Sequence, residues 1–263
     1  MKQQTEIKTL DDIEFPEVLY KYRSWNNEFN KRFITKREVF MASPDMFEDR
    51  LDCKIPVRYD LMTPEQAKQV YTRISKLDNT LSRQQKRKRV RQLLDRKEYL
   101  DPEFNANYQK IYFSGYFERL GVLSLTAENC LESMWNKYAD NGKGFCVGYN
   151  SRILFEYLGG GGKVEYVNEL PTILPDPIMS REEIRWKQVY FKEKKWEFEK
   201  EYRTQKFWEI PATISDRQII LPRDAFNCVI LGNNMSSDEK NDITQAIENE
   251  IGKIKIIEQK NVC

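Results

Sequence analysis

The chain has 263 residues and a mass of 31.5 kDa, long enough to bury a substantial hydrophobic core. Its 43 basic and 41 acidic residues nearly cancel, which excludes the chain-wide positive field of a general nucleic-acid or membrane binder. Hydrophobic residues make up 40% and aromatic residues 13%, and this composition indicates a packed globular protein rather than a disordered one.

Two residue types restrict the possible catalytic sites. The chain contains no histidine, which rules out Ser-His-Asp and Cys-His catalysis and His-ligated zinc. An enzyme built from this chain must use carboxylates, tyrosines, arginines or lysines, or an oxygen-ligated metal such as magnesium. The five cysteines are widely spaced and form no C-x-x-C pair, so we expect buried, reduced thiols without a disulfide framework or a zinc site.

No segment carries a membrane or secretion signal. The apolar runs are all shorter than the roughly 18 residues that a membrane-spanning helix needs. The first ten residues, MKQQTEIKTL, lack the apolar core of a secretory signal. We therefore expect a cytoplasmic protein that does not insert in a membrane.

The N-terminal region is predicted to mix strands with a helix. Residues 18–22 form a short β-prone run. Ser24, followed by aromatic residues at helical spacing, predicts a capped amphipathic helix. Residues 38–42 then predict a second strand, closed by Ser-Pro-Asp.

Residues 63–118 show long helical periodicity, with Thr63 predicted as N-cap and Pro64 at the first helical position. Within this stretch, residues 83–97 carry a dense basic cluster. One interpretation is a contact with a nucleic-acid phosphate backbone through Lys86, Arg87, Lys88 and Arg89. The other is a solvated helix face that makes no such contact.

The rest of the chain is rich in short strands. Strands are predicted at residues 121–125, 144–149, 164–167, 227–231 and 253–257, with a helix at 237–250 between the last two. We therefore predict a single α+β domain over residues 1–263, in which residues 63–118 are a helical insertion. Its sheet is expected to be mixed, and split or bent.

Two motifs are the most informative. In MWNKYADNGKGFCVGY, Trp135 and Tyr138 lie one helical turn apart and lead through a glycine turn into a strand. In EFEKEYR, the carboxylates of Glu197, Glu199 and Glu201 recur at two-residue spacing, which in a strand would direct all three to one face.

These motifs resemble a known family. The segments LYKYRS, FMASPDMFEDRLD, GVLSLT, MWNKYADNGKGFCVGY, WEFEKEYR and VILG, in this order, are similar to the bacterial domain-of-unknown-function family 2971. The resemblance covers most of the chain outside the helical insertion, and it implies no established activity. The family usually has an Asn-Asp-Pro-like turn after the second strand, where this chain has Phe-Glu-Asp-Arg at residues 47–50.

A second resemblance concerns mechanism. Arg23, Ser124 and Glu199-Lys200-Glu201 follow the order of the arginine, serine and Glu-x-Glu elements of Arg-Ser-Glu type ADP-ribosyltransferases. The resemblance implies NAD as cofactor, with Arg23 holding the diphosphate and Glu201 as the catalytic carboxylate. Glu199 would orient the acceptor or the ribose. The middle element departs from the family, because Ser-Leu-Thr replaces Ser-Thr-Ser.

Further pocket residues are expected on the same pattern. The side chains that we expect to line the NAD site are Tyr22, Ser124, Trp135 and Tyr138. The simplest alternative for the two aromatic residues of the MWNKY motif is burial in the core. For Arg23 it is an ion pair with a glutamate, and for Glu199 and Glu201 it is an exposed face balanced by neighbouring cations.

The leading hypothesis from the sequence is an ADP-ribosyltransferase-like enzyme that modifies a protein or nucleic acid, in toxin or phage-defence biology. The alternative is a non-catalytic module that binds nucleic acid or protein, the basic cluster being the nucleic-acid contact. A third hypothesis is a magnesium-dependent nuclease that uses Glu48, Asp49 and Asp52, although these acids are also compatible with a simple charged turn and we assign no metal site.

Overall fold

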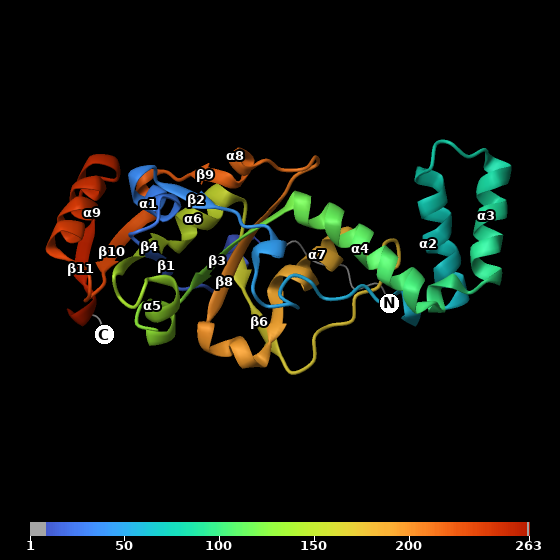
Figure 1. Cartoon of the computed structure of the whole chain (residues 1–263), viewed down its shortest axis with the longest axis horizontal. Coiled ribbons are helices and arrows are strands. Elements are labelled where there is room, and N and C mark those ends of the chain that lie inside the picture. The colour runs from blue at the N-terminus through green and yellow to red at the C-terminus, as the bar shows by residue number, and fades with distance from the viewer. Residues whose placement is uncertain (1–8, 262) are drawn as a thin grey trace. The chain divides into compact units, whose positions relative to one another are not determined.

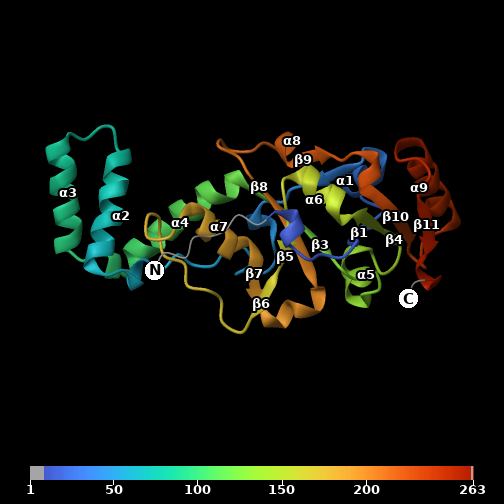
Figure 2. The same cartoon turned by 180° about the vertical axis from the view of Figure 1, so that it is seen from behind.

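The computed structural model describes residues 9–261 and 263. The described chain forms two compact units. Unit 1 comprises Pro44–Glu118 and Glu165–Glu193, and unit 2 comprises residues 9–43, Arg119–Val164 and Lys194–Cys263. Figures 1 and 2 show their helices and strands from two opposite sides. Among the described helices, none is long and apolar enough to cross a lipid bilayer.

Unit 2 is built on a seven-stranded sheet in the order β11-β10-β4-β1-β3-β8-β5. The strands are β1 (Val18–Ser24), β3 (Leu120–Thr126), β4 (Gly144–Asn150), β5 (Gly162–Lys163), β8 (Glu201–Phe207), β10 (Phe226–Leu231) and β11 (Lys255–Glu258). The pair β10–β11 is parallel, and the other neighbours are antiparallel. The mixed sheet, together with the helices, confirms the predicted α+β class.

Helices cover both faces of this sheet. The helices α1 (Glu28–Thr35), α6 (Ser151–Leu158) and α9 (Ser237–Glu250) contribute Phe33, Leu154 and Ile243 to the larger core cluster, which also contains Leu19 and Val147 of the sheet. The helix α5 (Glu132–Tyr138) packs on the opposite face. In Figures 1 and 2, α5 accordingly lies on the other side of β1 and β4 from α1 and α6. A two-stranded ribbon, β2 (Glu38–Phe40) with β9 (Gln218–Ile220), and the short α8 (Ile214–Arg217) complete the unit.

The sheet is weakly joined at its centre. The strands β1 and β4 pair over seven residues, whereas β1 and β3 share one registered pair, Tyr20 opposite Thr126. Next to that pair, the ammonium of Lys21 donates a hydrogen bond to the backbone carbonyl of Ser124. A side chain thus takes the place of a backbone amide as donor to β3.

Unit 1 contains the predicted helical segment as α2 (Pro64–Leu77), α3 (Arg83–Asp95) and α4 (Pro102–Arg119). The capping prediction is confirmed: the side chain of Thr63 accepts from Gln66 N, and the Gln66 side chain accepts from Thr63 N. For α1, the N-cap is Asn27 rather than the expected Ser24, because the β1 strand continues through Ser24.

The remaining elements of unit 1 are α7 (Arg181–Tyr190) and the parallel pair β6 (Glu165–Val167) and β7 (Phe191–Glu193). The hydrophobic core of unit 1 is rich in tyrosine, including Tyr59, Tyr71 and Tyr99. The buried Gln188 of α7 satisfies both the amide and the carbonyl of Ile55, at 2.8 and 2.7 Å. These bonds tie α7 to the segment before α2.

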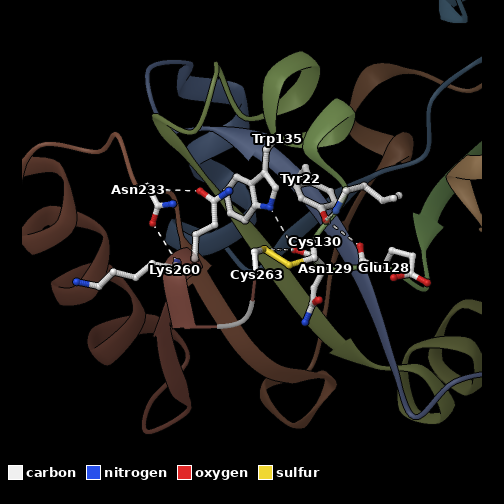
Figure 3. Close-up of a disulfide and its surroundings, with 10 residues drawn as sticks. Tyr22, Glu128, Asn129, Cys130, Trp135, Asn233, Lys260 and Cys263 are labelled. Carbon is white, nitrogen blue, oxygen red and sulfur yellow. Dashed lines mark hydrogen bonds between the residues drawn. A yellow bond between two sulfur atoms is a disulfide. The ribbon is translucent and has the colours of Figure 1, made fainter.

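The cysteine prediction is correct for three residues and wrong for two. Cys53, Cys146 and Cys228 are free and buried. Cys130 and Cys263 form a disulfide across 133 residues of sequence. Figure 3 shows this bond beside the loop between β3 and α5. In that loop Asn129 O accepts from Trp135 Nε1 at 3.2 Å, so the disulfide links the C-terminal segment to the support of α5.

Replacement of Cys130 by serine is expected to lower the free energy of unfolding by about 2–4 kcal/mol, because the unfolded chain is no longer cross-linked. Urea denaturation under non-reducing conditions measures this change. A reductant should destabilise the wild type by a similar amount and leave Cys130→Ser unaffected. Equal stability of the two proteins without reductant would contradict the structural role of the bond.

Candidate functional site

The first predicted catalytic residue, Glu201, lies in a buried ion pair. Glu201 begins β8 and is 5% exposed, while Arg203, two residues on along the same strand face, is 0% exposed. The guanidinium binds the carboxylate through two parallel hydrogen bonds, Nε to Oε1 and Nη2 to Oε2, both of 2.9 Å. This bidentate geometry is the strongest form of arginine–carboxylate contact. The alternative of an exposed glutamate face is therefore wrong in its exposure, although the ion pair with a neighbouring cation is present.

The three carboxylates of EFEKEYR do not share a strand face. Glu197 and Glu199 lie in the 3-10 helix η5 (Lys194–Glu199), and Lys200 has a φ of +43° that turns the chain into β8. Glu199 is itself buried at 8% exposure, and its backbone carbonyl accepts from Thr126 Oγ1 at 2.7 Å. The turn separates the glutamates, so the repulsion expected of a single carboxylate row does not arise.

Arg23 is a cation that has no acidic partner among the described residues. Its Nη1 donates to its neighbour's carbonyl, Tyr22 O, at 3.0 Å, and its Nε makes no hydrogen bond. The guanidinium carbon lies 4.7 Å from the centroid of the Phe33 ring, a cation–π contact. Burial of the guanidinium lowers the pKa of Arg23 to about 10. The alternative of an ion pair with a glutamate is not what the structure contains.

The strand register places Arg23 and Glu201 on opposite faces of the sheet. Tyr20, Thr126 and Glu201 are registered across β1, β3 and β8 and therefore point to one face. Arg23 is three residues from Tyr20 along β1, so it points to the other face, where Phe145 is its partner on β4. The assignment of Arg23 and Glu201 to one active site stays a prediction that this register does not favour.

Close packing of the backbone fixes the end of β1 that carries Arg23. Gly144 begins β4 opposite Ser24. A Cβ on Gly144 would lie 2.2 Å from the carbonyl oxygen of Arg23, nearer than any real Cβ contact. Glycine is thus required for the pairing that holds Arg23 at this position.

Arg23 lines a polar cavity of about 430 Å³, which is within the size range of small-molecule sites. The other lining residues are Ser24, Asn30, Asn136, Lys137, Tyr138 and Asp140. Tyr138 is 37% exposed, and the Lys137 ammonium lies 5.1 Å from its ring centroid. Asp140, the one acid of the lining, accepts from Asn26 Nδ2 at 3.0 Å. Two basic residues and several residues with amide or hydroxyl groups therefore line one cavity.

The other predicted pocket residues lie elsewhere. Trp135 is 2% exposed and packs edge-on against Tyr22 with ring centroids 5.1 Å apart. The Tyr22 hydroxyl donates to Glu128 O at 2.8 Å and accepts from Leu131 N at 3.3 Å (Figure 3). Both rings are core residues, whereas Tyr138 reaches the cavity. Ser124 sits on β3 opposite Arg203, on the same face as Glu201.

Sequence reasoning missed Lys21 of β1, which is sensitive to the charges of both Arg23 and Glu201. The charges of Arg23, Glu201 and Arg203 all act on its ammonium. Burial, followed by the charge of Arg23, lowers its pKa well below the ordinary value. The signal that could have revealed Lys21 is its place in the alternation Leu19, Lys21, Arg23, which puts two cations on the core-facing side of β1.

The remaining candidates lie in unit 1. Of the basic cluster, Lys86 donates to Lys76 O at 3.2 Å and Arg89 is ion-paired with Asp78 at 2.9 Å, whereas Arg87 and Lys88 are exposed. Of the acids proposed for magnesium, Asp52 is buried and ion-paired with Lys192 at 3.4 Å. No group of three potential metal ligands occurs in the described residues.

The buried pair makes a sharp prediction about stability. Arg203→Met is expected to cost about 3–5 kcal/mol, because it leaves the Glu201 carboxylate buried without its cation. The double variant Arg203→Met/Glu201→Gln should be less destabilised than the sum of the two single variants by more than about 1 kcal/mol. Chemical denaturation of the three variants measures this coupling.

The exposed pair Arg58–Asp60, at 2.6 Å, supplies the matched control. Arg58→Met should cost about 1 kcal/mol or less, since both side chains are solvated. Similar costs for Arg58→Met and Arg203→Met would contradict the structural weight given to the buried pair.

Lys21 should make stability depend on pH. Between its lowered pKa and the ordinary value of about 10.4, the unfolded chain binds a proton at Lys21 that the folded protein does not, so stability rises with pH in this window. Lys21→Met removes this contribution. The wild type should therefore gain stability relative to Lys21→Met as the pH is raised from neutral to alkaline. The exposed Lys36→Met variant should track the wild type at every pH.

Comparisons with known proteins add no relative. No protein-family profile matches the chain, and no curated protein or solved structure is significantly similar to it. The resemblances drawn from the motifs therefore stay predictions, and the arrangement of the residues carries the functional argument.

Proposed function

We propose that unit 2 binds a phosphate-bearing nucleotide at the Arg23 cavity, with NAD as the candidate ligand that the Arg, Ser, Glu series indicates. The observation that carries the proposal is the guanidinium of Arg23, which is packed on Phe33 beside a polar cavity and has no carboxylate partner among the described residues. A cation that is partly removed from water and has no anion beside it is costly in a folded protein. A bound phosphate would compensate for that cost.

The other lining groups suit such a ligand. An arginine fork matches two phosphate oxygens in one plane, and Lys137 is a second basic residue in the lining of the cavity. The amides of Asn30 and Asn136 can bind ribose or phosphate oxygens. The half-exposed ring of Tyr138 offers a surface on which a base can stack. The carboxylate of Asp140 repels a highly charged ligand, and it can accept hydrogen bonds from ligand hydroxyl groups such as those of ribose.

Transfer of ADP-ribose is a separate step of the proposal. It would use the Glu201 carboxylate, which in this structure is engaged by Arg203 and faces the other side of the sheet. A transferase would therefore need a rearrangement that frees Glu201, whereas ligand binding at Arg23 needs none. Binding and turnover can consequently be tested independently.

Arg23→Gln is expected to weaken nucleotide binding about 10-fold to 100-fold, the effect of losing hydrogen bonds to a charged group. Isothermal titration of the full chain with NAD, ADP-ribose and ADP measures the affinity. Arg152→Gln is the matched control: it removes the same charge from unit 2, but Arg152 is exposed and ion-paired with Asp11, which is also exposed. Its affinity should equal that of the wild type. No binding of any of the three ligands to the wild type would refute the proposal.

The stability of Arg23→Gln separates function from folding. Because Arg23 has no acidic partner, its replacement should change the free energy of unfolding by less than about 1 kcal/mol, in contrast to Arg203→Met. Nicotinamide release, followed by mass spectrometry with and without Glu201→Gln, then tests the transferase step. Binding without any release would leave unit 2 as a nucleotide-binding module.

A further inference from the structure

The exposed face of α3 in unit 1 carries an unpaired row of cations. Arg83, Arg87 and Arg91 recur every four residues, which places them along one side of the helix at a rise of about 6 Å per step. Lys88 lies beside this row. All four side chains are exposed, and none forms an ion pair with a described residue. The only acid of α3 is Asp95, its last residue.

The packing of α3 leaves this face open. The helix is anchored to unit 1 by Val90, which is 8% exposed, with Leu93 and Leu94 packed against the same core. Its neighbours within the unit are α2 and the turn η4 (Glu98–Leu100). In Figures 1 and 2, α2 and α3 form a helical hairpin in which α3 is the second arm.

The cluster therefore divides into engaged and available cations. Lys86 donates to Lys76 O and Arg89 is ion-paired with Asp78. These two contacts join α3 to α2 and to the loop that follows α2. The four cations of the open face hold no such contact and repel one another in the absence of a partner. Helix propensity does not explain them either, since glutamine or glutamate would serve equally well.

We propose that this face, named the arginine row and comprising Arg83, Arg87, Lys88 and Arg91, binds the phosphate backbone of a nucleic-acid duplex without reading its sequence. Arginine is the residue best suited to phosphate, and a row of cations along one helix can meet a repeating line of charges. The chain's near-zero net charge makes the row a local feature rather than part of a general basic surface.

The surroundings favour a duplex over a single strand. Proteins that bind single strands combine cations with aromatic side chains on which unpaired bases stack. In α2 and α3 the sole aromatic residue is Tyr71, which is 1% exposed. The hairpin thus offers charges for a backbone and no exposed ring for bases.

The test is fluorescence anisotropy of the full chain with short labelled duplexes of DNA and of RNA, in mixed sequences, over a series of salt concentrations. The affinity should be the same for different sequences, and log K should fall against log salt with a slope of about −3 to −4, as for four neutralised phosphates. The two kinds of duplex distinguish which nucleic acid is preferred. A single strand should bind more weakly than the matching duplex.

Replacement of Arg83, Arg87 and Arg91 by glutamine should reduce the slope by about 2.7 and the affinity at low salt by at least about 10-fold. The matched control replaces Arg58, Arg152 and Arg181, which are exposed arginines ion-paired with Asp60, Asp11 and Asp176. It removes the same three charges and should bind like the wild type. Circular dichroism of both variants checks that the helices are retained.

Three results would overturn the proposal. One is the absence of duplex binding by the wild type at low salt. Another is an equal loss of affinity in the two triple variants, which would mean that overall charge and not the row is responsible. The third is tighter binding of a single strand or of an acidic polypeptide than of the duplex. Each of these outcomes is independent of the Arg23 cavity, because that site is tested with the small ligands NAD, ADP-ribose and ADP and with a different variant.

Discussion

The buried pair of Arg203 and Glu201 is the interaction on which the arrangement of unit 2 depends. It sits on β8, next to β3, in a sheet whose centre is joined by one registered pair between β1 and β3. Neutralising either partner alone removes the bidentate counter-charge of the other where solvent is excluded. The charges of this pair also act on Lys21. The side chain of Lys21 donates a hydrogen bond to Ser124 O of β3, next to the single registered pair between β1 and β3. The Lys21 hydrogen bond and the Arg203–Glu201 pair therefore supply side-chain contacts in the region that backbone pairing leaves weak.

Two arginines of the same sheet illustrate opposite uses of this side chain. Arg203 is fully buried and matched to a carboxylate by two hydrogen bonds, so its guanidinium contributes to the fold. Arg23 is partly exposed, borders a cavity and rests on an aromatic ring. Arg23 pairs with no acid among the described residues, so its positive charge adds little to the stability of the fold. This contrast, rather than the order of motifs along the chain, supports a binding role for Arg23.

Local sequence signals predicted much of the fold, since they depend on neighbouring residues. The Thr63 cap, the helix at 237–250 and the strand after Gly144 follow from capping chemistry and periodicity, and the structure contains all three. The helix α6 was not predicted, because its polar positions are few and its glycine-rich end resembles a loop. The Cys130–Cys263 bond could not be predicted, since the pairing of cysteines 133 residues apart depends on the tertiary fold.

The candidate site was less predictable for a related reason. The EFEKEYR motif fits a strand by spacing, but one residue with positive φ, Lys200, ends that periodicity and divides the glutamates between two elements. Likewise, spacing places Trp135 and Tyr138 on one side of α5, yet the tertiary fold buries the first and leaves the second at the cavity. Spacing within an element can be read from a sequence, whereas which side of the sheet an element covers cannot.

Because basic and acidic residues are nearly equal in number, a cation without an acidic partner indicates a position that is available to an anionic ligand. With 43 basic and 41 acidic residues, a cation without an acid reflects placement and not an excess of one sign. In α3, Lys86 and Arg89 have oxygen partners within unit 1, whereas the arginine row has no ion pair with a described residue. In the sheet, Arg203 is paired with Glu201, whereas Arg23 has no acidic partner among the described residues. Exposed charges, such as those of the arginine row, are screened within about 10 Å at moderate salt. Arg23 is only partly exposed, but it borders its cavity directly, so both groups act on a ligand at close range. An anion that meets either group must therefore dock on it, which makes the two surfaces separable by variants that change one and spare the other.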